Sequence, residues 1–130
     1  MYKNSWLLLI GVILILAAVF VPTLSFDRML RRDSDLFMAK INEICDVEDD
    51  NYVEINKKCE ELETLWNEHM DHWSFVVHHS AIERIDLSIA SFIEYSKGGE
   101  RGSMDIEAKK IEKMLGITSR QDKLDLLNIL

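Results

Sequence analysis

Mostly apolar residues recur in steps of three and four between positions 52 and 73, the spacing that places them on one face of an α-helix. This face consists of Tyr52, Ile55, Cys59, Leu62, Trp66, His69 and Trp73. A later segment repeats the spacing with Ile82, Ile85, Ile89, Phe92 and Ser96. A helix hides such a face by packing it against another helix, so we expect the two segments to lie side by side.

The same periodicity predicts a helix over about residues 27–46, with Leu30, Phe37, Ile41 and Ile44 on one face. This helix can continue from an N-terminal helix through a bend at Pro22. Asp50 or Asn51 can cap the next helix, since Asn51 is followed three residues later by Glu54 in the capping-box arrangement. A break after Trp73 separates that helix from the third one.

Glycines indicate where the later helices end. The Gly98-Gly99 pair closes the third helix, and Gly116 closes a fourth. Thr118 or Ser119 then caps a short C-terminal helix. We therefore predict an all-α fold, an antiparallel helical bundle of three long helices plus one or two short C-terminal helices.

The N-terminal segment is apolar enough to enter a membrane. Every residue from Trp6 to Val21 is apolar or glycine, and residues 6–26 together form a helix of roughly 31 Å, against about 30 Å for the hydrocarbon core of a bilayer. We predict a transmembrane anchor over residues 1–26, in contact with lipid through residues 6–26, and an acidic helical domain over residues 27–130. A cleaved signal peptide, with Thr23 and Ser25 before the cleavage site, is the alternative.

The two sides of the apolar tract both carry positive charge. Arg28, Arg31 and Arg32 follow it, which by the positive-inside rule would keep the domain in the cytoplasm. The leader that carries Lys3 is short, however, and a short leader before a strong apolar core is typical of an exported signal-anchor. We expect a single-pass protein of the cell membrane with an extracytoplasmic domain.

Charge limits the partners of the second domain. All 23 acidic residues and 14 of the 15 Lys and Arg follow residue 26, which leaves a formal charge of −9 there. A phosphate backbone would be repelled, so we expect no nucleic-acid partner. A homo-oligomer is compatible with the pattern, because apolar helix faces serve dimers and intramolecular bundles equally well.

The four histidines all lie between positions 69 and 79. His69 and His72 are one helical turn apart, and a hairpin could bring His79 and Glu83 toward them, which would give nitrogen and oxygen ligands of the kind that zinc accepts. The chain has neither His-Glu-x-x-His nor Glu-x-x-His, the spacings that mark strong metal sites. We predict histidines bonded to carboxylates, with no metal and no cofactor, and keep a metal- or small-ligand-binding sensor as the alternative function.

The aromatic residues have two interpretations. Trp66 and Trp73 could line a ligand pocket or contact a partner together with His79, but at this spacing they are more typical of a core. Cys45 and Cys59 should lie roughly 10 Å apart along an antiparallel helix pair, as separate buried thiols. No nucleophile elbow or phosphate-binding glycine motif is present, so we predict no enzyme activity.

Several motifs together resemble a known family. They are Leu65-Trp66, Trp73, His79, Ile82, Ile85, Leu87-Ser88, Tyr95 and the closing Asn128-Ile129-Leu130. With the apolar N-terminal helix, this pattern resembles the small membrane-anchored bacterial proteins of domain of unknown function 4363 (DUF4363). The chain departs from that pattern at His78, where we expect an acidic residue. The resemblance implies an uncharacterised single-pass protein of Gram-positive anaerobes that accompanies a multi-pass membrane protein, with no activity to carry over.

The function that these features favour is a non-catalytic interaction module. The anchor would hold the helical domain near a membrane-protein partner, and an exposed part of the Trp-His segment or of the apolar C-terminal tail would dock on it.

Overall fold

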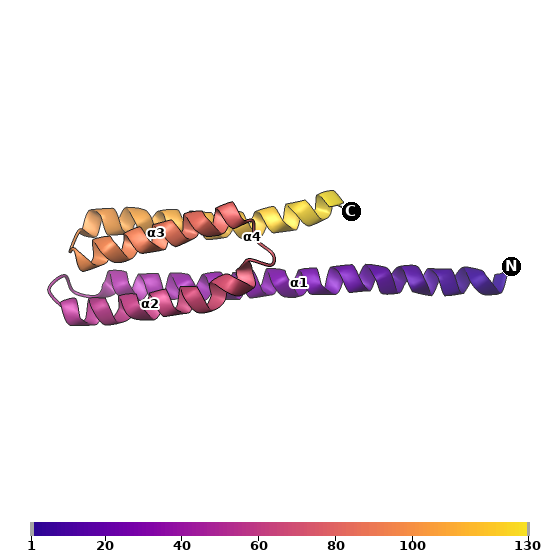
Figure 1. The fold of residues 1–130 in the computed structure, drawn as a ribbon, viewed down its shortest axis with the longest axis horizontal. Helices are drawn as coiled ribbons and strands as arrows, with labels where there is room; N and C mark the ends of the chain where they lie inside the picture. The colour runs from indigo at the N-terminus through magenta and orange to yellow at the C-terminus, as the bar shows by residue number, and fades with distance from the viewer. Residues whose placement is uncertain (1, 130) are drawn as a thin grey trace.

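The computed structural model describes residues 2–129, apart from the side chains of residues 2, 3, 23 and 119–129. This range forms four α-helices, α1 (Tyr2–Asp46), α2 (Tyr52–Trp73), α3 (His79–Lys97) and α4 (Arg101–Ile129), and contains no strand. The predicted all-α class is confirmed. The connections are short, and consecutive helices run in opposite directions along a common axis (Figure 1).

Two helices are longer than the sequence signals indicated. α1 is a single helix of 45 residues that continues through Pro22. α4 continues through Gly116, so the prediction of a separate short C-terminal helix is wrong, and the described chain has four long helices. Thr118, expected as a cap, donates its hydroxyl to the carbonyl of Met114 at 2.8 Å, a bond made by residues inside a helix. One glycine within a helix costs only about 1 kcal/mol, which the neighbouring buried residues offset.

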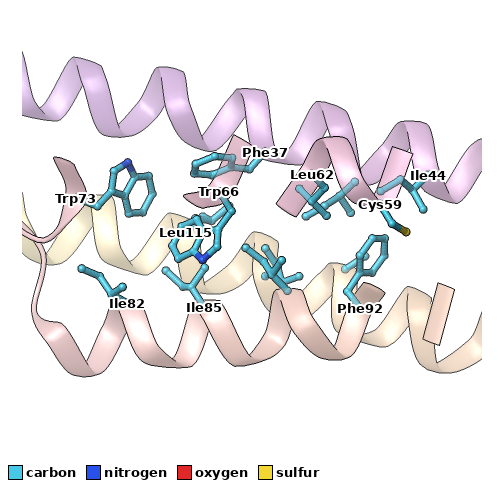
Figure 2. Packing of buried hydrophobic residues seen from close by; sticks show 14 of the residues in the cluster. Phe37, Ile44, Cys59, Leu62, Trp66, Trp73, Ile82, Ile85, Phe92 and Leu115 are labelled. Carbon is cyan, nitrogen blue, oxygen red and sulfur yellow. The ribbon is translucent and has the colours of Figure 1, made fainter. Parts of the chain in front are cut away.

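All four helices contribute to one apolar core (Figure 2). α1 and α3 each contact both α2 and α4, so the helices surround this core as a ring of four neighbours. The buried apolar residues are Leu30, Phe37, Ile41 and Ile44 of α1; Ile55, Cys59, Leu62, Trp66 and Trp73 of α2; Val77; Ile82, Ile85, Ile89 and Phe92 of α3; and Met104, Ala108, Ile111 and Leu115 of α4. We call the part of the four helices that shares this core the bundle.

The predicted contact between the two patterned segments is confirmed. α2 and α3 are neighbours, and all five residues of the α3 face, residues 82–96, are buried. On the α2 face, Tyr52 is exposed, because it is the first residue of its helix and lies at one end of the bundle. His69 is half-buried. The predicted cap is also present, since the Asn51 side chain accepts a hydrogen bond from the Glu54 backbone N–H at 3.3 Å.

The N-terminal half of α1 lies outside the bundle. Figure 1 shows it extending beyond the end at which α2 connects to α3, in the same direction as the C-terminal part of α4 and farther than α4 reaches. It contains a stretch long and apolar enough to cross a membrane, and none of that stretch is buried within the structure. The apolar tract is therefore continuous with the part of α1 that packs in the bundle. Leu30, the first buried residue among the described side chains of α1, follows Phe26 by about 6 Å of helix.

Candidate functional site

The bundle end nearest the apolar tract contains a cluster of aromatic rings. The ring of Phe37 lies 5.4 Å from that of Trp66 and 5.6 Å from that of Trp73, and the two indoles are 5.8 Å apart, all between ring centroids. The two tryptophans are 1% and 0% exposed (Figure 2). The contacts of Trp66 with Phe37 and with Trp73 are edge-to-face, a geometry that stabilises a core beyond the area that it buries. The core interpretation of Trp66 and Trp73 is confirmed, so neither indole is on the surface as a contact residue for a partner.

Each indole donates a hydrogen bond to a carboxylate on a different helix. Trp73 Nε1 donates to Asp33 Oδ2 of α1 at 3.0 Å, and Trp66 Nε1 donates to Asp86 Oδ1 of α3 at 2.8 Å. Asp33 is only 1% exposed, whereas Asp86 faces water. A buried carboxylate requires a hydrogen-bond donor, which Trp73 supplies, and His69 Nδ1 lies 3.4 Å from the same Oδ2 of Asp33. These bonds fasten α2 to both of its neighbours.

The structure does not bring the candidate metal ligands together. His69 is half-buried beside Asp33, and His72 is exposed near the end of α2. His79 pairs instead with Glu83 one turn along α3, with Nε2 2.9 Å from Oε1 and the histidine side chain 85% exposed. Within the described residues, no three His, Cys, Asp or Glu side chains gather in a way that could hold a metal ion. Histidine and carboxylate side chains thus lie beside each other at two separate places, His69 with Asp33 and His79 with Glu83.

The two cysteines are free thiols in separate environments. Cys59 lies in the core, and Cys45 is half-buried near the end of α1. Burial raises the pKa of both thiols, because the thiolate form loses its hydration there. Neither has the lowered pKa that activates a nucleophilic cysteine.

Four charged side chains connect α1 with α2 on the surface. Lys40 of α1 lies 2.9 Å from Glu61 of α2, and Lys58 of α2 lies 3.3 Å from Glu43 of α1, between nitrogen and oxygen atoms. Hydrogen bonds from Lys40 lower the pKa of both glutamates, and its own bond to Glu61 raises the pKa of Lys40. This network adds pH-dependent attraction between the two helices.

At the opposite end of the bundle, Arg101 connects α4 with the segment between α1 and α2. It is the first residue of α4, and its guanidinium donates to the Asp49 carboxylate and to the backbone carbonyls of Cys45 and Val47, the latter at 2.7 Å. The last carbonyls of a helix have no partner within the helix, so a cation is favourable there. Arg101 thereby holds the connection from α1 to α2 against the start of α4.

Asp33, Asp86 and Arg101 were missed by the sequence reasoning. A signal was available for Asp33 alone, because it continues the spacing of Leu30 and Phe37 along the buried face of α1. A charged residue on an apolar face indicates a bonded partner inside the protein.

These features define an all-helical protein in which the unburied apolar half of one helix continues into a helical core. Hydrogen bonds from two indoles to carboxylates connect the helices of that core. The sequence pattern described as Domain of unknown function (DUF4363) matches residues 26–129, and the chain belongs to this family. The match begins where the apolar tract ends. A comparison with curated proteins found no match, and a comparison with solved structures found none either.

Proposed function

We propose that the protein is a single-pass protein of the cell membrane whose antiparallel bundle is a non-catalytic interaction module that docks on a membrane-protein partner. The observation that carries the proposal is the continuity of α1. An apolar helix of the length of a bilayer, with none of it buried, runs without a linker into the bundle core. Lipid is the environment that such a segment needs.

The anchor positions the bundle close to neighbouring membrane proteins and confines it to the plane of the membrane. The two tryptophans are buried between helices, so we expect a partner to contact residues on the outside of the bundle. His79 is the candidate contact residue from the Trp-His segment.

Anchoring is tested by extraction. Membranes that contain the full-length protein are washed with alkaline carbonate, which removes peripheral proteins. The chain is expected to stay with the lipid, and a Leu14→Arg variant is expected to be released in part, because a charge near the centre of the tract opposes insertion by about 3 kcal/mol. Complete release of the unaltered chain would refute the anchor.

Docking is tested with a photo-crosslinking amino acid at one exposed apolar position in each helix. These positions are Leu36 in α1, Val53 in α2, Leu87 in α3 and Ile106 in α4. A partner that docks on one face should give a discrete adduct with a membrane protein from neighbouring positions and none from the opposite face. An adduct of the chain with itself would replace the partner by a homo-oligomer, and the same diffuse products from all four positions would refute docking.

A further inference from the structure

The connection between α2 and α3 carries an exposed aromatic side chain. Phe75 is 83% exposed, within the five residues that separate Trp73 from His79. Exposure alone says little, because single apolar residues on a surface are common. Val53, at the other end of α2, is 81% exposed. Phe75 differs from Val53 in its position relative to the apolar tract.

Phe75 lies at the end of the bundle from which the apolar half of α1 extends. Figure 1 shows the α2–α3 connection beside α1 at this end. The hydrogen bond between Trp73 and Asp33, 3.0 Å long, places the last residue of α2 level with Asp33 in α1. α2 runs antiparallel to α1 (Figure 1), so the chain beyond Trp73 continues toward the apolar tract.

The distance of this connection from the end of the apolar tract, measured along α1, follows from helix geometry. Asp33 follows Phe26, the end of the tract, by seven residues, or about 10 Å of helix. Two further residues beyond Trp73 bring Phe75 to about 7 Å from the end of the tract. The headgroup region on each side of a bilayer is about 5–8 Å deep, because the whole bilayer measures about 40–45 Å around a core of about 30 Å. Phe75 therefore reaches the outer part of the headgroup region.

We propose that the α2–α3 connection is a second membrane contact, in which Phe75 inserts among the lipid headgroups of the bilayer that α1 spans. This inference rests on the proposed function in one respect, that residues 6–26 cross the membrane. Insertion at this depth is favourable for an aromatic ring, because its apolar surface leaves water. Exposed Arg28, Arg31 and Arg32 lie on α1 at the same end, where they suit anionic headgroups. The bundle is then fixed to the membrane at two points, by α1 and by the α2–α3 connection.

The test compares Phe75→Cys with Val53→Cys, each carrying an environment-sensitive NBD label, in the full chain reconstituted in vesicles of phosphatidylcholine and phosphatidylglycerol. Two quenchers report depth, iodide in the water and a nitroxide lipid labelled near the headgroup. The label at position 75 should be shielded from iodide and lose roughly half of its emission to the nitroxide lipid, because it lies within the headgroup layer. The label at position 53 should show the reverse. The unsubstituted chain, treated with the same reagent, measures any labelling of Cys45 and Cys59.

A third label, at Leu16→Cys near the middle of the tract, separates the two proposals. If the label at position 16 is quenched by a nitroxide deep in the acyl chains while the label at position 75 behaves like that at position 53, the second contact is refuted and the anchor stands. If position 16 is open to iodide, the anchor itself fails. Thermal melts of the Phe75→Cys and Val53→Cys variants confirm that each bundle is folded, as expected for exposed positions.

Discussion

The bond between Trp73 and Asp33 should contribute more to stability than the bond between Trp66 and Asp86, although the two look alike. Trp73→Phe removes the N–H that satisfies a carboxylate with 1% exposure, and a hydrogen bond to a charged group contributes about 1.5–3 kcal/mol. The space left by the smaller ring adds about 1 kcal/mol, so we expect a loss of about 2.5–4 kcal/mol. Trp66→Phe leaves a similar space, but Asp86 regains water, and we expect a loss of about 2 kcal/mol.

The measurement is chemical denaturation of the full-length protein in detergent micelles, followed by near-ultraviolet circular dichroism. This signal comes from packed aromatic rings and therefore reports the bundle rather than the helix content of the apolar tract. A double-mutant cycle with Asp33→Leu, which removes both acceptor oxygens at similar volume, isolates the bond, and the coupling energy with Trp73→Phe should be about 1.5–3 kcal/mol. Equal losses for the two tryptophan variants, or a coupling energy below about 0.5 kcal/mol, would show that burial of the acceptor carboxylate does not determine how much stability the hydrogen bond contributes.

Three further expectations concern other parts of the molecule. Arg101→Ala should speed amide hydrogen exchange in residues 47–51 and cost about 1–2 kcal/mol, because carbonyls of that connection lose their donor; unchanged exchange would exclude this role. The lowered pKa values of Glu43 and Glu61 add stability that is present above their ordinary value of 4.5 and is lost as the pH falls through their folded-state values. Melting temperatures should therefore fall from about pH 7 to about pH 3. The fall should be less steep in Lys40→Ala, where Glu61 loses its partner and Glu43 keeps only Lys58, and parallel curves would contradict the attribution. Added zinc should leave the melting temperature unchanged, since the histidines lie in separate pairs, and a rise that a chelator reverses would restore the sensor hypothesis.

The buried faces of α2 and α3 could be predicted because helical periodicity alone decides which residues share a face. Cys59, Leu62 and Trp66 occupy the core as their spacing indicated, and so do Ile85 and Phe92. Burial follows from the pattern in this way whenever the apolar face of a helix is directed at the core.

The bonds that select one arrangement of the helices could not be predicted. Trp73 and Asp33 are 40 residues apart in the chain, and Arg101 and Asp49 are 52 apart. Periodicity within one helix contains no information about which residue of another helix lies opposite. The continuation of α4 through Gly116 has a related cause, because tertiary packing of the helix outweighs the local preference of glycine to end it.

The uninterrupted passage of α1 from the tract into the core makes the orientation of the bundle depend on residue number. Each residue turns a helix by about 100° and lengthens it by about 1.5 Å. One alanine inserted between Phe26 and Leu30 would swing the bundle to another side of α1 and carry Phe75 to a different azimuth around it. Seven inserted residues would restore that azimuth to within about 20° but raise the bundle by about 10 Å, out of reach of the headgroups. In the proposed membrane arrangement, the length of this short segment thus sets both the direction in which the bundle faces and its distance from the bilayer.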